Sequence, residues 1–305
     1  MRLVTCSNDS HAQPWVGLIV EGERVINVSA ASGAPFDSST MLGLLDAGSD
    51  GSAWLRDLEK RGEASLPLEG LRLWAPIPRP RKNVFCVGWN YVEHFREGEK
   101  TRAAALDLPD HPTFFTKAPT AVNGPRDAIP IDASITEKLD WEVELAVVIG
   151  KRGRSIAEAD AMEYVWGYTV LNDVTGRDIQ RRHGQQWFKG KSLDGSCPMG
   201  PWLVSADALD SQALRIACWV NGVLKQESST EYMHFRIPRI IAELSHGLTL
   251  EPGDIIATGT PAGVGHARVP PEFLHEGDVL ESEIEGIGRL RNVIGTGTQT
   301  SGLQS

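Results

Sequence analysis

The stretch "KLDWEVELAVVIGK", residues 138–151, constrains the fold more than any other part of the chain. Its β-branched and aromatic residues alternate with acidic or small ones, and this period of two predicts a β-strand. Successive side chains of a strand point to opposite faces. One face would carry Trp141, Val143, Leu145, Val147 and Ile149, and the other Asp140, Glu142, Glu144, Ala146 and Val148. Neighbouring carboxylates in a half-buried position repel each other, so we expect a positive group to neutralise them.

Strand-like segments recur over most of the chain, whereas helical periods are few and short. The candidate strands are residues 84–87, 113–116, 140–150, 164–172, 201–204, 214–220, 255–258 and 278–284. The best candidate helices are residues 91–98, 158–162, 175–182 and 236–246. Strands and helices do not alternate regularly, as they would in a βαβ fold. We therefore expect a mainly β fold with peripheral helices (α+β).

Changes in composition along the chain predict four parts. Residues 1–75 are expected to form a small β-rich N-terminal domain, and residues 84–295 a larger one. Residues 76–83 between them are rich in proline and basic side chains, which is typical of a linker. Residues 296–305 are polar and rich in glycine, which predicts a flexible tail.

Charge and hydropathy exclude two classes of partner. The formal net charge is −10 and the basic residues are scattered, whereas nucleic-acid binding normally needs a clustered basic face. No segment reaches the roughly 20 apolar residues of a membrane span, and no apolar leader follows the basic start. We therefore expect a cytoplasmic protein that binds neither nucleic acid nor membranes. Four widely spaced cysteines predict reduced, mostly buried thiols: Cys6, Cys86, Cys197 and Cys218.

Glu142 and Glu144 form a pair of acids on one face of the first strand. Two residues apart on a strand, their Cβ atoms lie roughly 6–7 Å from each other. Both side chains would therefore reach one hard cation such as magnesium, whose ligand oxygens lie at about 2.0–2.1 Å. An acidic strand edge exposed to solvent remains the alternative.

Asp173 ends the candidate strand 164–172, just before a helical segment. Such an acid often serves as a helix N-cap, and taken alone that is its more common role. Strand ends are also where side chains converge on a site. Together with Glu142 and Glu144, Asp173 would make an oxygen-rich site for magnesium or manganese with positions open for water and substrate.

The segment 90–97, "NYVEHFRE", predicts a short helix. Asn90 is a suitable N-cap, and Glu93 has the spacing of a capping box. A helix from Tyr91 places His94 and Glu97 on one face, three residues apart. Such a carboxylate can fix the imidazole tautomer and raise its basicity, which suits a general base. A surface ion pair has the same spacing and remains open.

Two further segments carry polar groups without a decisive pattern. Lys189 and Lys191 lie among glycines and aromatic residues, where a lysine either faces an anionic intermediate or extends over the surface. The turn around Thr258 and Thr260 is rich in glycine but lacks the motifs of phosphate-binding loops. No role is predicted for four histidines that lack ligand-like spacing: His183, His234, His246 and His266.

Seven segments resemble the fumarylacetoacetate hydrolase family in order and spacing, over about residues 80–294. They are "NYVEHFRE", "FTKAPTAVNGP", "LDWEVELAVVIGK", "GYTVLNDVTGRDIQ", "KGKSLDGSCPMGP", "VNGVLKQ" and "EPGDIIATGTPAGVG". The resemblance implies a mixed β-roll catalytic domain at 84–295, a small N-terminal domain of the kind that many members carry, and a homodimer. No acid lies near Asn90 to match the fourth metal ligand of the hydrolase that names the family.

The resemblance also implies a role for particular residues. Glu142, Glu144 and Asp173 would hold Mg²⁺ or Mn²⁺, with Ca²⁺ as a substitute in crystals, and Asp140 lies outside this set. A His94–Glu97 pair would activate water, and Lys191 would face an oxyanion. Substrate contacts would come from Tyr91, Arg177, Gln180 and Thr260.

By the same resemblance, the leading hypothesis is an acylpyruvase-like hydrolase of C–C bonds. It would act on a 1,3-diketo acid of the acylpyruvate or fumarylpyruvate type, from aromatic or sugar catabolism, through an enolate held on the metal. Alternatives with the same site are an oxaloacetate-type 2-oxo acid decarboxylase, an oxo-heptenedioate isomerase or decarboxylase, and an oxo-pentenoate hydratase. A ureidoglycolate lyase is less supported. The alternative outside enzymes is a metal-dependent ligand-binding protein.

Overall fold

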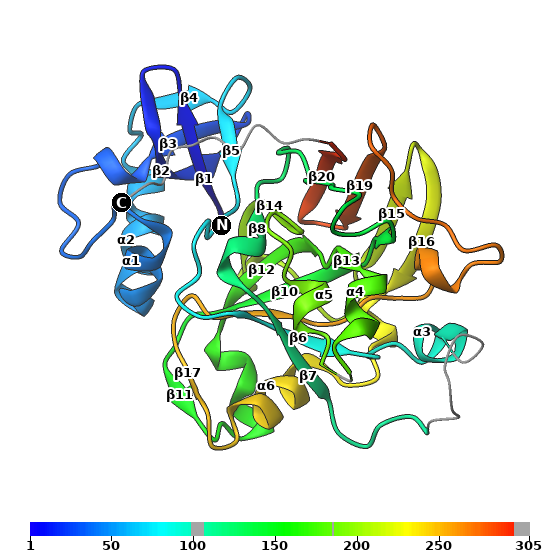
Figure 1. Ribbon diagram of the computed structural model, residues 1–305. Coiled ribbons are helices and arrows are strands. Elements are labelled where there is room, and N and C mark those ends of the chain that lie inside the picture. Colours follow the sequence, from blue (N-terminus) through cyan, green and yellow to red (C-terminus); the bar gives the residue numbers. More distant parts are fainter. Residues whose placement is uncertain (99–106, 185, 296–305) are drawn as a thin grey trace.

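The computed structural model describes residues 1–98, 107–184 and 186–295 (Figure 1). The predicted tail at 296–305 lies outside these residues. Among the described residues, no helix is both long and apolar enough to cross a membrane. The chain is mainly β with short helices at the periphery, as the strand-rich sequence predicts.

A large sheet of twelve strands forms the frame of the molecule, in the order β4-β3-β2-β1-β14-β12-β10-β18-β6-β7, with β5 on β1 and β8 on β14. Its strands are β1 (Arg2–Asn8), β2 (His11–Val20), β3 (Arg24–Asn27), β4 (Ser65–Pro67), β5 (Arg72–Trp74), β6 (Val84–Gly88), β7 (Thr113–Lys117), β8 (Val122–Asn123), β10 (Val143–Ile149), β12 (Val165–Asn172), β14 (Cys197–Ser205) and β18 (Ile255–Ala257). Most neighbours are antiparallel, whereas β18 pairs with β6, and β8 with β14, in parallel.

Smaller sheets and short helices surround this frame (Figure 1). A four-stranded antiparallel sheet has the order β16 (Val223–Ser229), β15 (Arg215–Val220), β19 (Val279–Ile284) and β20 (Gly288–Val293). Two strand pairs are β9 (Leu139–Asp140) with β13 (Thr175–Gly176) and β11 (Gly153–Arg154) with β17 (Thr249–Leu250). The α-helices are α1 (Met41–Asp46), α2 (Gly48–Lys60), α3 (Val92–Glu97), α4 (Arg177–Arg182), α5 (Phe188–Lys191) and α6 (Ile237–Ser245).

Strand β10 separates two hydrophobic cores, which explains its alternating sequence. Val143, Leu145 and Val147 on one face pack into one core, together with α6 and the four-stranded sheet. Ala146 and Val148 on the other face pack into a second core, shared with β1, α1 and α2. Both faces are therefore buried, and the acids that precede Ala146 on this second face are buried with it.

The N-terminal segment joins the same large sheet. β1 pairs with β14 in an antiparallel register, with Arg2 opposite Val204 and Leu3 opposite Leu203. Helices α1 and α2 lie beside the N-terminal strands in Figure 1, and they contribute to the second core. The predicted division into a domain at 1–75, a linker at 76–83 and a domain at 84–295 stays a prediction.

The bounds of several predicted elements need correction. The strand expected at 140–150 is interrupted at residues 141–142, because the Asn172 side chain accepts from Glu142 N at 2.9 Å in place of a backbone carbonyl. The helix expected at 175–182 begins only at Arg177, since Thr175 and Gly176 pair with β9. The helix expected at 158–162 is a 3₁₀ helix over Glu158–Tyr164.

Candidate metal centre and active site

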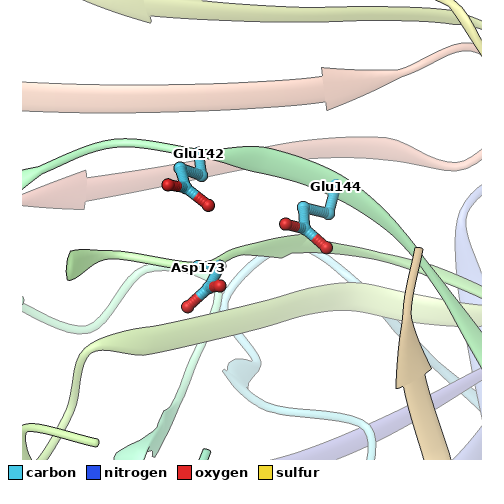
Figure 2. A group of neighbouring side chains, drawn as sticks. All are labelled: Glu142, Glu144 and Asp173. Atoms are coloured by element: carbon cyan, nitrogen blue, oxygen red, sulfur yellow. The ribbon is translucent and has the colours of Figure 1, made fainter. Parts of the chain in front are cut away.

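Three carboxylates from two neighbouring strands converge on one point of the structure. Glu142 directly precedes β10, Glu144 is the second residue of β10, and Asp173 follows the end of β12. The antiparallel register pairs Glu144 with Leu171, and this brings the two strand ends together. Figure 2 shows the three carboxyl groups pointing toward one another, and one oxygen from each lies within 4.8 Å of the others. All three residues are buried, which excludes an acidic strand edge exposed to solvent.

Backbone and amide groups fix the positions of these acids. Asp173 N donates to Glu142 O at 2.8 Å, and Glu142 N donates to the side-chain oxygen of Asn172 at 2.9 Å. Gly259 N, in the turn after β18, donates to Glu144 Oε2 at 2.7 Å. Asp173 is not the N-cap of α4, because Gly176 precedes that helix.

Three basic side chains surround the carboxylates and offset part of their charge. Lys191 Nζ lies 2.8 Å from Glu142 Oε2 and 2.7 Å from Asp173 Oδ2. Arg177 Nη2 lies 2.5 Å from Glu142 Oε1. Lys117 Nζ, at the end of β7, lies 2.8 Å from Asp173 Oδ1. The positive charge expected to neutralise the carboxylates is therefore supplied in part by two lysines and an arginine of the protein. No local sequence pattern predicts a role for Lys117.

The three acids differ in their electrostatic surroundings. Burial alone would raise the pKa of Glu142, but Lys191 and Arg177 outweigh it and hold the pKa of this carboxyl below its usual range. Burial and the charges of Asp173 and Glu142 raise the pKa of Glu144 well above its ordinary value. Among the described residues, Gly259 is the one hydrogen-bond donor to the Glu144 carboxylate. Glu144 is thus the acid that most lacks a positive partner.

This donor set fits a hard divalent cation. Magnesium and manganese prefer carboxylate oxygens, and the cluster provides three of them on a buried surface. A cation here would relieve the repulsion that Glu144 experiences from its two neighbours. The residues therefore suit the Mg²⁺ or Mn²⁺ that the family resemblance implies.

Helix α3 brings a histidine–carboxylate pair to the same region. His94 Nδ1 lies 2.7 Å from Glu97 Oε1, and the two side chains are only 11% and 20% exposed. Glu97 Oε2 accepts from Gly263 N at 2.8 Å. Gly263 belongs to the same turn after β18 as Gly259, which donates to Glu144, so the pair is tied to the turn that contacts the acids. This partly buried, tethered pair differs from a free surface ion pair.

The capping box predicted for α3 is wrong. Tyr91 is the N-cap residue, and it makes no capping hydrogen bond through its side chain. The Asn90 amide instead connects three segments: it donates to the carbonyls of Phe235 at 3.0 Å and Thr258 at 2.7 Å, and accepts from Phe235 N at 2.7 Å. These distant backbone groups hold Asn90 away from the N–H groups of the helix.

The side chains expected to contact substrate differ in the number of hydrogen bonds that they already make within the protein. Arg177 is buried between Asp140 and Glu142, and it donates to Gln180 at 3.2 Å. The Thr260 hydroxyl donates to the Val143 carbonyl and accepts from a side-chain amide, at 2.9 and 2.8 Å. Their contacts with substrate stay predictions.

Tyr91 differs from these residues because its hydroxyl group makes no hydrogen bond to a described residue. Its side chain is buried, and the hydroxyl has no hydrogen-bond partner among the described residues. Burial and the charge of Glu144 raise its pKa, so the phenol stays protonated at neutral pH. Tyr91 therefore keeps a free donor beside the acids, and its predicted contact with substrate also stays a prediction.

Residues 83–295 match the family model described as the fumarylacetoacetate (FAA) hydrolase C-terminal domain. The oxaloacetate tautomerase YisK of Bacillus subtilis is 42% identical over 294 residues, which cover 92% of this chain and 96% of that protein.

Two solved structures are similar along almost the whole chain. A fumarylacetoacetate hydrolase of the psychrophilic Exiguobacterium antarcticum has a TM-score of 0.82 and 38% identity, and the match covers 97% of this chain and 99% of the other. A maleylpyruvate hydrolase of Sphingobium sp. SYK-6, solved with manganese(II) and pyruvate, has a TM-score of 0.75 and 29% identity, with 97% and 99% covered.

Proposed function

The chain belongs to the fumarylacetoacetate hydrolase family, and on this premise we propose that it is a metal-dependent enzyme that interconverts the keto and enol forms of oxaloacetate or a similar 2-oxo diacid. The observation that carries this proposal is the buried Glu142–Glu144–Asp173 cluster beside the His94–Glu97 pair, in a chain similar throughout to an oxaloacetate tautomerase. C–C bond hydrolysis, the leading hypothesis from the sequence, becomes the second candidate.

Glu142, Glu144 and Asp173 would hold Mg²⁺ or Mn²⁺ through their facing oxygens. When bound, the metal supplies positive charge against the negative charge that develops on the substrate oxygen. Lys191 and Arg177 add two buried positive charges beside these acids. A dianionic substrate would find in them the charge complementarity that the acidic surface of the protein does not offer.

His94 is the proposed proton-transfer residue at the substrate carbon. A carboxylate accepts hydrogen bonds only, so Glu97 keeps the imidazole proton on Nδ1 and leaves the Nε2 lone pair free. That lone pair would take the C3 proton of the keto acid, and the protonated ring would return it in the reverse direction. Gly263 N fixes Glu97 and thereby the imidazole, so proton transfer needs no search for the correct orientation.

Hydrolysis of a diketo acid is the second candidate, and two observations favour it. The same free Nε2 of His94 would equally accept a proton from water. A maleylpyruvate hydrolase with bound manganese and pyruvate has a similar structure. The two candidates differ in the atom that loses its proton to His94.

The test follows the loss of enol absorbance with purified protein, separately with enol-oxaloacetate and with acetylpyruvate, in Mg²⁺, Mn²⁺ or EDTA. We expect metal-dependent ketonisation of oxaloacetate without release of new products. Formation of acetate and pyruvate from acetylpyruvate at a higher kcat/KM would favour the hydrolase instead. Full activity in EDTA, together with full activity of Glu142→Gln, would contradict both metal-dependent candidates.

The family resemblance also leads us to propose that the protein is a homodimer in the cytoplasm. Light scattering coupled to gel filtration tests the oligomeric state, with about twice the mass of the 33.2 kDa chain expected. A monomeric mass at micromolar concentration would contradict the dimer.

A further inference from the structure

A second histidine–carboxylate pair lies beside the acidic cluster. His266 Nδ1 is 3.0 Å from Asp140 Oδ2. The Asp140 side chain is fully buried, whereas 17% of the His266 side chain is exposed. The two residues are 126 positions apart, so their spacing in the sequence could not indicate a pair.

Asp140 fixes the orientation of this imidazole. Its Oδ1 accepts from the backbone N of Trp141 and Gly265 at 2.8 and 2.7 Å, and its Oδ2 accepts from His266 N at 3.0 Å. Arg177 Nε donates to the same Oδ2 at 2.8 Å. Three backbone N–H groups and a guanidinium thus donate to this side chain, as suits a carboxylate. A carboxylate only accepts, so the His266 proton lies on Nδ1 and Nε2 keeps its lone pair.

The pair is connected to both parts of the candidate active site. Arg177 Nε donates to Asp140 Oδ2 at 2.8 Å, while its Nη2 donates to Glu142 at 2.5 Å. The turn that carries His266 also holds Glu97 of the first pair through Gly263 N. The Arg177 guanidinium thus connects the His266–Asp140 pair to Glu142. His266 also follows, by three residues, the Gly263 that contacts Glu97.

The chemical state of His266 suits a proton acceptor. Burial and the charge of Arg177 lower its pKa, although Asp140 and Glu142 act in the opposite direction. The ring is therefore neutral at pH 7. Among the described residues no hydrogen bond to Nε2 is found, and 17% of the His266 side chain is exposed.

We propose that His266, oriented by Asp140, is a second proton-transfer residue of the site and serves the substrate oxygen while His94 serves the carbon. This inference rests on the proposed tautomerase function. In the direction from enol to keto, His266 Nε2 takes the O–H proton as the C=O bond forms. The electrons of the C=C bond take a proton from protonated His94 at C3. One proton leaves and one arrives, no redox change occurs, and solvent then restores both imidazoles.

Ketonisation moves protons at two substrate atoms, an oxygen and a carbon, and each of the two histidine–carboxylate pairs can serve one of them.

Two substitutions separate orientation from proton transfer. His266→Asn keeps an amide donor where Nδ1 lies, so the contact with Asp140 is retained while the Nε2 lone pair is lost. His266→Gln places its amide near the position of Nε2 and gives up the contact with Asp140. Because general acid–base catalysis typically contributes at least 100-fold, we expect kcat for enol-oxaloacetate to fall by about 100-fold in both variants. The Mn²⁺ dissociation constant, measured by EPR, should stay within about twofold of wild type in His266→Asn.

A surface pair of the same chemistry provides the matched control. His275 Nδ1 lies 3.8 Å from Asp278, and its side chain is 77% exposed. His275→Asn should leave kcat and Mn²⁺ binding unchanged. Wild-type kcat in His266→Asn would overturn the proposal, and so would an equal loss in His275→Asn.

An independent measurement keeps the proposal testable if oxaloacetate is not turned over by the wild type. That result would contradict the proposed function alone. Malonate, a non-reacting dicarboxylate, is then added to the ¹⁵N-histidine-labelled, Mg²⁺-loaded protein, and the Nε2 resonance of His266 is assigned with His266→Asn. A shift of this resonance supports contact with ligand at the site. An unchanged resonance with malonate bound at saturation overturns the proposal.

Discussion

Lys117 Nζ lies 2.8 Å from Asp173 Oδ1, and neither side chain is exposed to solvent. Besides this ion pair, the ammonium donates hydrogen bonds to the Val174 carbonyl at 3.1 Å and to Ser196 Oγ at 3.3 Å. A lysine with no exposed surface is rare unless it is paired. Lys117 is therefore part of the charge balance of the acidic cluster, at the end of β7.

Lys117→Met should destabilise the protein strongly. Removal of one member of a buried ion pair leaves its partner uncompensated and costs about 3–5 kcal/mol. Here Lys191 still contacts Asp173, so we expect the lower end of this range. The measurement is the urea midpoint in EDTA. Lys151→Met is the control, because Lys151 forms an exposed pair with Glu163 at 3.8 Å, of a kind that contributes about 0–1 kcal/mol. Equal shifts in both variants would contradict the assigned role.

Glu144→Gln should change stability in opposite directions with and without metal. Burial, together with repulsion from Asp173 and Glu142, raises the pKa of Glu144, so its ionised form opposes folding in EDTA. The amide removes this repulsion, and the variant should melt at an equal or higher temperature than wild type in EDTA. With saturating Mg²⁺ the order should reverse, since a ligand at 100 times its dissociation constant adds about 2.7 kcal/mol.

A surface acid provides the control for this reversal. Glu163→Gln alters a side chain that is 70% exposed and should leave the metal-dependent shift in melting temperature intact. A Glu144→Gln variant that gains the full wild-type shift on addition of Mg²⁺ would show that Glu144 is not a ligand.

The cysteines should not react with thiol reagents in the native state. All four are buried and unpaired, and burial raises the pKa of Cys6 and of Cys197 to about 12. At pH 8 only about one such thiol in 10,000 is ionised, and the thiolate is the reactive form. We expect no rapid reaction with Ellman's reagent in buffer and four equivalents in urea. Rapid reaction of one equivalent in buffer would contradict this burial.

The local alternation of residues was sufficient to predict β10 and its two faces, but not the interruption at residues 141–142. Val143, Leu145 and Val147 point to one core and Ala146 to the other because the period of a strand is two. The carboxylate pair could be predicted for the same reason. What alternation could not predict is that both faces are covered, since the helices and strands that cover them come from distant parts of the chain.

Contacts that depend on sheet register could not be predicted from local sequence. Lys117 meets Val174 across 57 positions, and Gly265 meets Asp140 across 125. Nothing near Lys117 distinguishes a buried ammonium from a lysine that ends a strand at the surface. His266 could not be predicted for the same reason, because its partner Asp140 lies on β9, 126 positions away in the sequence.

Asn90→Ala should destabilise the protein and displace α3, since a residue that fits an N-cap serves here as a bridge between segments. Its buried amide makes three hydrogen bonds to Phe235 and Thr258, and the alanine leaves these backbone groups without partners. Loss of a partner costs a buried polar group about 1–3 kcal/mol. We expect a lower urea midpoint. Because α3 carries His94, we also expect kcat to fall, with a smaller change in KM. Asn83→Ala, which removes one hydrogen bond of 3.1 Å to Thr116, is the control. An unchanged midpoint and kcat in Asn90→Ala would contradict the bridging role.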